Sequence, residues 1–176
     1  MLWLPQCEEK EGSVILERIK NYMKEDSVAI SDYLDEKLVV FFEVHTQGEA
    51  LQTLVDLLDK EGKLRDKQTF YEAIQQREKI VSTGIGIGVA IPHAKIPGYD
   101  DFFIAIGIQK NDGIEWQALD GLPVRIIFMI GGPDDEQTEY LNILSMITAA
   151  IKDEERRKKL LKATNAQDVV AIFEDL

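Results

Sequence analysis

The longest apolar runs of this sequence are only as long as a β-strand, and they alternate with segments of helical periodicity. Runs rich in β-branched and aromatic residues span 37–45, 102–109 and 124–130. The first of them is expected to be buried on both faces. Because helices and strands interleave throughout, we predict a single α/β domain, with a central mixed β-sheet of about four to five strands covered by helices on both faces.

The segments between the apolar runs carry helix signals. Thr46 and Glu49 form a capping box, which predicts a helix that begins directly after Thr46. A short amphipathic helix is expected at 13–24, either packed on the domain or bound to a partner protein. The other predicted helices cover 66–79, a segment that begins near 134, about 153–163 and about 166–174.

The charge and the cysteine content exclude several classes of function. The chain has 20 basic and 32 acidic side chains, and its net charge of −12 repels phosphate backbones and anionic membranes. We therefore expect no nucleic-acid partner and no stable membrane insertion, but a partner protein with a basic face. Cys7 is the single cysteine, which excludes an intramolecular disulfide and argues against a thiolate metal site. The apolar start is too short for a signal-peptide core, so we expect a cytoplasmic protein. We also expect no metal and no cofactor.

Residues 82–95, STGIGIGVAIPHAK, place three glycines at every second position. The stretch matches neither the P-loop pattern nor the G-x-G-x-x-G pattern of dinucleotide-binding loops. If 83–91 is a strand, its two-residue period makes one face apolar and leaves the other, with Gly84, Gly86 and Gly88, almost bare. Such a bare face allows either a helix of the same chain or a partner protein to come close.

His93 follows this predicted strand. Pro92 should keep Ile91 extended and end the strand pairing, which would leave His93 at the end of the strand, where α/β proteins commonly place their sites. The nucleophile elbow G-x-S-x-G of serine hydrolases is absent from the sequence, and a metal site made only of His93 and His45 is a weak alternative. Two roles remain for His93: it is a structural histidine, or it is itself the nucleophile.

The stretch REKIVSTGIGIGVAIPHAK, residues 77–95, resembles the active-site signature of the fructose/mannitol-type EIIA domains of the bacterial phosphotransferase system. This family includes the nitrogen-regulatory EIIA proteins. The resemblance covers roughly 28–176, with VAISDYLDEKLVV at its start, GIEWQALDGLPVRIIFMIGGP in its middle strands and YLNILSMI in the following helix. We therefore expect an EIIA type 2 domain at 28–176 and an N-terminal extension at 1–27.

The resemblance implies that His93 accepts a phosphoryl group from an HPr-like histidine phosphocarrier and passes it on. It also implies that Arg77, sixteen residues earlier, stabilises the phosphate. An uncharged imidazole must attack, and Arg77 can lower the pKa of His93 by like-charge repulsion and then hold phosphate oxygens with its planar fork. The alternative for Arg77 is a surface ion pair with Glu72 or Glu78 on the same helix.

Other residues near the signature have more open roles. Ser82 and Thr83 offer hydroxyl donors to the phosphoryl group. Tyr140 stands where many relatives carry a second histidine, so the role of that histidine transfers only in part, and the alternative is a core aromatic on an apolar helical stripe. The residues expected to let a partner protein approach His93 are Gly84, Gly86, Gly88 and Pro92.

Three functions follow from this reading. The first is a nitrogen-regulatory-like EIIA, which reports its phosphorylation state through contacts with a regulated target protein. The second is a sugar-specific EIIA of the fructose/mannitol type, which passes its phosphate to a cysteine of a separate EIIB. The third is a binding module that keeps the fold and is not phosphorylated. We favour the first, because the domain carries an N-terminal extension and Cys7 lies outside the domain.

Overall fold

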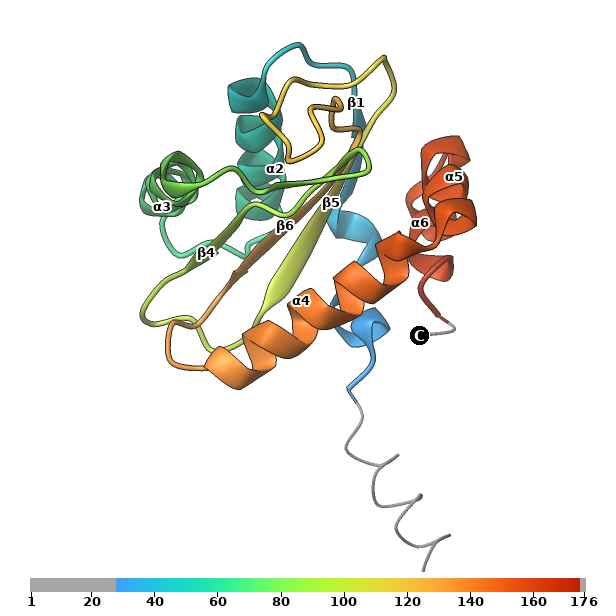
Figure 1. The fold of residues 1–176 in the computed structure, drawn as a ribbon. Coiled ribbons are helices and arrows are strands. Elements are labelled where there is room, and N and C mark those ends of the chain that lie inside the picture. Colours follow the sequence, from blue (N-terminus) through green and yellow to red (C-terminus); the bar gives the residue numbers. More distant parts are fainter. Residues whose placement is uncertain (1–27, 175–176) are drawn as a thin grey trace, which may run out of the picture.

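The computed structural model describes residues 28–174, and the helix predicted at 13–24 lies outside this range. At its centre is a mixed sheet with helices on both faces (Figure 1). The predicted fold class, a single α/β domain, is thereby confirmed. None of the helices within residues 28–174 is both long enough and apolar enough to cross a bilayer.

The described residues form a six-stranded sheet in the order β1–β5–β6–β3–β2, and β4 pairs with β6 further along that strand. β1 is parallel to β5, β5 is antiparallel to β6, and both β3 and β4 are parallel to β6. β2 and β3 pair as an antiparallel hairpin. The strands are β1 (Val39–Phe42), β2 (Gly84–Gly86), β3 (Val89–Ala90), β4 (His93–Lys95), β5 (Phe103–Gln109) and β6 (Ile126–Gly132).

Two groups of helices cover the two faces of the sheet (Figure 1). α2 and α3 pack on one face, against Ile127 and Met129 of β6. α4, α5 and α6 pack on the other face, against Phe128 and Ile130. Because successive side chains of β6 enter opposite cores, both of its faces are buried, which explains its continuous apolar sequence. The helices are η1 (Ile30–Tyr33), η2 (Glu36–Leu38), α2 (Gln47–Lys60), α3 (Lys67–Ile80), α4 (Gln137–Lys152), α5 (Glu154–Lys162) and α6 (Ala166–Ala171).

Several predicted elements form where the sequence indicated them. The runs at 102–109 and 124–130 correspond to β5 and β6. The capping box is present: Thr46 Oγ1 accepts a hydrogen bond from the N–H of Glu49, and the Glu49 carboxylate accepts one from the N–H of Thr46. The other predicted helices within the described residues correspond to α3, α4, α5 and α6, with ends shifted by a few residues.

The interpretation of 37–45 as a strand buried on both faces is wrong. Its beginning belongs to the 3-10 helix η2, and the strand itself is the shorter β1. Among the described strands, β1 pairs with β5 alone and is therefore an edge strand. Val39, Val40 and Phe41 are accordingly only partly buried.

The prediction of one continuous strand at 83–91 is also wrong, because the chain turns back between β2 and β3. Gly86, Ile87 and Gly88 have φ angles of 93°, 53° and 76°, in the left-handed region that glycine adopts without strain. The expected alternation between an apolar and a bare face is therefore lost, and Ile87 is exposed. Turn geometry accounts for Gly86 and Gly88, and their use by an approaching partner stays a prediction.

Gly84 and Pro92, also expected to serve a partner, have roles within the fold. A Cβ added at Gly84 would lie 2.9 Å from Ala118, so packing within the chain explains this glycine. Pro92 does not end the pairing with the sheet, because its carbonyl accepts a hydrogen bond from the N–H of Ile130 at 3.0 Å and β4 begins at the next residue. His93 therefore opens a strand instead of ending one. The division of this region into β2, β3 and β4 gives the sheet more strands than the four to five expected.

Candidate functional site

His93 is partly buried at the start of β4, and its two ring nitrogens contact different groups. Nδ1 lies 3.0 Å from the carbonyl oxygen of Ile91, and Arg77 Nε donates to Nε2 at 3.0 Å. Because a carbonyl oxygen only accepts and a guanidinium only donates, Nδ1 carries the ring hydrogen and Nε2 presents its lone pair. These two partners therefore select one neutral tautomer of the imidazole.

The surroundings of His93 also favour its neutral state. Burial lowers the pKa of the imidazole below its ordinary value, and the hydrogen bond to the Ile91 carbonyl partly opposes this effect. The positive charges of Arg77 and Lys95 lower the pKa further, whereas the Glu78 carboxylate raises it. Burial is thus a larger cause than the repulsion by Arg77 that the sequence led us to expect. The ring is uncharged at neutral pH and retains a nucleophilic nitrogen.

Arg77 reaches His93 from the last turn of α3. Its Nη1 donates to the carbonyl oxygen of Val81 at 3.0 Å, so two acceptors orient the guanidinium. Within residues 28–174 these are its hydrogen-bond partners, and the alternative ion pair with Glu72 or Glu78 is not formed. The structure thus brings Arg77 and His93 together across sixteen residues of sequence.

Tyr140 and Lys95 border the imidazole. Tyr140 is buried near the start of α4, and its ring centroid lies 5.3 Å from that of His93. Burial raises the pKa of the phenol to about 12, so Tyr140 is neutral. Lys95 Nζ lies 4.8 Å from the Tyr140 ring centroid and donates to Gln137. Lys95 was not predicted as a site residue from the sequence. Residues two apart on a strand lie on the same face, so its spacing from His93 was the available signal.

The hydroxyl groups of Ser82 and Thr83 are engaged within the fold. Ser82 Oγ donates to the carbonyl oxygen of Trp116 at 2.7 Å. Thr83 Oγ1 donates to the Glu78 carboxylate at 2.5 Å and accepts from the indole N–H of Trp116 at 3.2 Å. Since a hydroxyl group has one hydrogen, neither can donate to a phosphoryl group without giving up its present bond. Their use as phosphate donors stays a prediction, and it requires that these bonds be exchanged.

The second histidine, His45, lies apart from these contacts. It is exposed directly before the N-cap of α2, and its backbone N–H donates to the Glu49 carboxylate at 2.8 Å. In residues 28–174 no cluster of three or more histidine, cysteine, aspartate or glutamate side chains is arranged to hold a metal ion.

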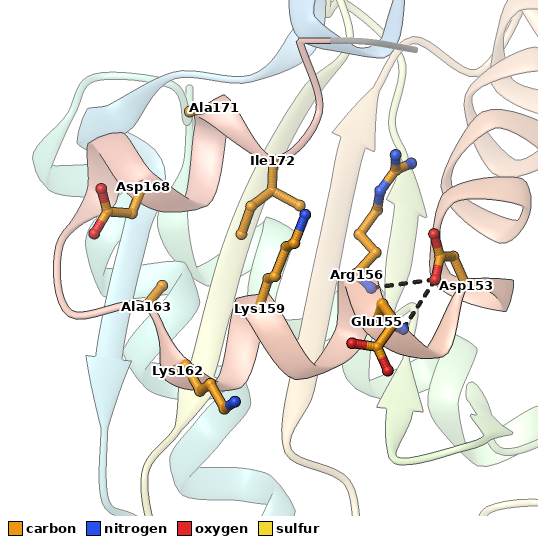
Figure 2. A pocket seen from close by; sticks show the side chains of 9 residues that line it. All are labelled: Asp153, Glu155, Arg156, Lys159, Lys162, Ala163, Asp168, Ala171 and Ile172. Atoms are coloured by element: carbon orange, nitrogen blue, oxygen red, sulfur yellow. Dashed lines mark hydrogen bonds between the residues drawn. The ribbon is translucent and has the colours of Figure 1, made fainter.

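A separate cleft of about 590 Å³ lies between α5 and α6 (Figure 2). Side chains of both signs line it, and the Asp153 carboxylate at its edge accepts the backbone N–H groups of Glu155 and Arg156 as the cap of α5. None of the residues that contact His93 lines this cleft. It is therefore not part of the candidate site.

Sequence comparison relates the chain to a group of phosphotransferase proteins. Residues 32–176 match the family model described as "Phosphoenolpyruvate-dependent sugar phosphotransferase system, EIIA 2". The chain is 41% identical over 123 residues to the fructose-specific EIIABC component of the phosphotransferase system of Bacillus subtilis (strain 168). This match covers 70% of the chain and 19% of the Bacillus protein, so the chain spans about a fifth of that relative.

Solved structures with the same fold belong to the same group. The nitrogen regulatory protein IIA-Ntr from Neisseria meningitidis superposes with a TM-score of 0.75 at 30% identity, over 82% of this chain and 98% of that one. The complex of enzyme IIA-mannitol with phosphorylated enzyme IIB-mannitol from Escherichia coli gives a TM-score of 0.68 at 18% identity, over 81% of this chain and 98% of that one. At that identity the second likeness concerns the fold alone.

Proposed function

Because this chain belongs to the EIIA 2 family of the phosphoenolpyruvate-dependent sugar phosphotransferase system, we propose that it is a phosphoryl carrier whose acceptor atom is Nε2 of His93. The donor is an HPr-like histidine phosphocarrier, and a partner protein receives the phosphoryl group or responds to it. The observation that carries the proposal is the pair of hydrogen bonds to the His93 ring. The Ile91 carbonyl places the ring hydrogen on Nδ1, and the bond from Arg77 shows that Nε2 presents its lone pair.

The transfer is a substitution at phosphorus. Nε2 of His93 forms the new P–N bond while the P–N bond of the donor phosphohistidine breaks, and the donor imidazole leaves with that electron pair. The phosphorylated ring gains positive character, which the Ile91 carbonyl stabilises through the N–H of Nδ1. Arg77 then exchanges its bond to Nε2 for bonds to phosphate oxygens, which its planar fork fits.

Lys95 and Tyr140 complete the surroundings of the phosphoryl group. Lys95 adds a second positive charge, since it lies close enough to His93 to lower the pKa of the imidazole. Tyr140 packs beside the imidazole and offers a neutral phenol that can donate one hydrogen bond. It cannot relay a proton as a second histidine would, because a phenol whose pKa is about 12 stays protonated at neutral pH.

A regulatory role is the form of this function that we favour. A nitrogen regulatory IIA-Ntr matches the chain at 30% identity, over 82% of this chain and 98% of that one. The carrier would then signal its phosphorylation state to a regulated target protein from the cytoplasm. We further propose that residues 28–176 form the phosphocarrier domain and that residues 1–27 are dispensable for phosphorylation.

A sugar-specific role is the second candidate, and the 41% identity to a fructose-specific EIIABC component favours it. In this case the phosphorylated chain would pass its phosphoryl group to a cysteine of a separate EIIB. Incubating the phosphorylated protein with a fructose-type EIIB and measuring the masses of both proteins separates the two roles. Quantitative transfer to EIIB supports the sugar-specific role, and retention on this chain supports the regulatory one.

The phosphorylation itself is tested by intact-mass measurement. The wild type, His93→Ala and, as a matched control, His45→Ala are incubated with phosphoenolpyruvate, enzyme I and an HPr-like carrier. We expect one phosphate adduct, labile in acid and stable in alkali, on the wild type and on His45→Ala, and none on His93→Ala. An adduct that persists on His93→Ala would contradict the assignment. A wild type that takes up no phosphate would indicate the third function, a binding module.

A further inference from the structure

Glu78 follows Arg77 on α3, and its carboxylate bonds to the segment that joins α3 to β2. Oε1 accepts the backbone N–H of Thr83 at 2.9 Å, and Oε2 accepts the Thr83 hydroxyl at 2.5 Å. Oε1 also accepts Gln47 Nε2, from the first turn of α2, at 3.0 Å. One partly buried carboxylate thus ties together α2, α3 and the start of the glycine hairpin.

Buried groups continue this network on the far side of Thr83. Trp116 is 1% exposed, and its indole N–H donates to Thr83 Oγ1 at 3.2 Å. The carbonyl oxygen of Trp116 accepts the Ser82 hydroxyl, and Ser82 Oγ in turn accepts the N–H of Gly84 at 3.1 Å. Because each member is bonded to the next, this segment has one favoured arrangement relative to α3.

The consequence for the site runs through Val81. Its carbonyl oxygen accepts Nη1 of Arg77, the same side chain whose Nε donates to Nε2 of His93. Val81 itself is exposed, so the position of its carbonyl depends on the residues that follow it in the chain. Thr83, two residues later, is the point at which Glu78 fixes that segment.

We propose that Glu78 is a positioning residue for Arg77. Its bonds to Thr83 hold the link at 81–83, and the Val81 carbonyl in that link aims the guanidinium at the imidazole. The inference rests on the proposed function, because the aim of Arg77 matters only if His93 receives a phosphoryl group. A second effect accompanies the first: the Glu78 carboxylate partly offsets the positive charges of Arg77 and Lys95 that act on the ring.

The test compares Glu78→Ala and Glu78→Gln with Glu72→Gln, a matched control on the same helix. Among residues 28–174, the Glu72 carboxylate accepts a hydrogen bond from nearby Gln68 alone. NMR of the unphosphorylated proteins follows the side-chain Nε–H signal of Arg77 and the titration of the His93 ring. Glu78→Ala should lose the protected Nε–H signal and slow phosphoryl uptake by about 10- to 100-fold, the scale of a misplaced catalytic group. Glu78→Gln should recover much of both, because its amide oxygen still accepts the N–H of Thr83.

The pKa of His93 should fall in both Glu78 variants, since each removes the negative charge that raises it, and should stay constant in Glu72→Gln. This readout separates Glu78 from a residue that only stabilises the fold. If Glu78→Ala does not fold, Thr83→Val removes both bonds of the hydroxyl, to Glu78 and to Trp116, and keeps the bond from the backbone N–H to Glu78. It should weaken the Arg77 signal and uptake in the same direction, with recovery in Thr83→Ser.

The Arg77 Nε–H signal of the unphosphorylated protein tests the positioning role, and the rate of phosphoryl uptake tests the proposed function. An Arg77 Nε–H signal and an uptake rate that both survive in Glu78→Ala, or in Thr83→Val where the former does not fold, would overturn the positioning role. Loss of the signal with unchanged uptake would retain the positioning role and remove Arg77 from the proposed transfer.

Discussion

The centre of the sheet is regular, whereas its side formed by β2, β3 and β4 is interrupted. β5 and β6 form a regular antiparallel ladder in which every residue is buried. β2, β3 and β4 are short pieces separated by a left-handed turn and by Pro92. The candidate site lies on this interrupted side, where His93 opens β4.

The interruption is what makes the His93 geometry possible. Ile91 lies between β3 and β4, and its carbonyl accepts the N–H of the His93 ring. In a regular ladder that carbonyl would bond to a neighbouring strand. The regular centre, β5 and β6, thus provides stability. The interrupted side, β2, β3 and β4, directs individual backbone groups toward the His93 imidazole.

The largest effect on stability should come from the regular centre. Phe128 of β6 is fully buried and packs edge-on against Phe173, with ring centroids 5.9 Å apart. Phe128→Ala should reduce the free energy of unfolding by about 3–5 kcal/mol, because it removes a buried ring and leaves a cavity. The exposed Leu119 serves as the control, and Leu119→Ala should change stability by no more than about 0.5 kcal/mol. Urea denaturation measures both free energies of unfolding. Equal losses in the two variants would contradict the conclusion that the centre of the sheet stabilises the fold.

The interrupted side should show the reverse, a large effect on rate with little on stability. Arg77→Lys keeps the positive charge but loses the planar fork that bonds to both Val81 and His93. The barrier to phosphoryl uptake should rise by about 1–3 kcal/mol, the size of a charge-assisted hydrogen bond. Quench-flow phosphorylation with the HPr-like carrier measures the rate, and urea denaturation provides the control. A rate equal to that of the wild type would place Arg77 outside the reaction.

The same contrast separates what the sequence predicted from what it did not. Burial on both faces dictates a continuous apolar run, so β5 and β6 were predictable, and the capping box of α2 is a local signal. The glycine hairpin was mistaken for a strand, because alternating glycine and apolar residues occur both in a strand and in a turn with left-handed glycines. Contacts with Ala118 and with Asp120, which accepts the N–H of Ile87, decide between them and lie about thirty residues away.

In the site, sequence resemblance indicated the pair of Arg77 and His93, which the structure brings within hydrogen-bond distance. The engagement of the Thr83 hydroxyl was not predictable, since its partner Trp116 is 33 residues distant in sequence. The contribution of Glu78 was missed because its carboxylate bonds to Thr83, beyond the end of α3, and to Gln47, 31 residues distant in sequence. The hydrogen-bond partners of such side chains depend on how several segments are arranged in the fold, and no local sequence pattern predicts them.

Tyr140 connects the two regions, because it packs in the core beside the His93 ring. Within the part of the chain that the structure describes, its phenol makes no hydrogen bond to another residue, so Tyr140→Phe should change stability by less than about 1.5 kcal/mol. If the phenol bonds to the phosphoryl group, uptake should slow or phosphohistidine should hydrolyse faster. Mass spectrometry over time measures both. Unchanged uptake and lifetime would assign Tyr140 to the core alone.

The smallest expected effect concerns strain in the interrupted side. Ile87 is 42% exposed with a φ of 53°, and its N–H donates to Asp120 at 2.7 Å. The left-handed region is unfavourable for a β-branched residue but accessible to asparagine, so Ile87→Asn should raise the free energy of unfolding by about 0.5–1 kcal/mol. Ile85 is the matched control, because it is similarly exposed in β2 without a left-handed φ, and Ile85→Asn should not stabilise the protein. Urea denaturation compares the two. Equal changes at both positions would show that the hairpin stores no strain, and the interrupted side would then differ from the centre in geometry alone.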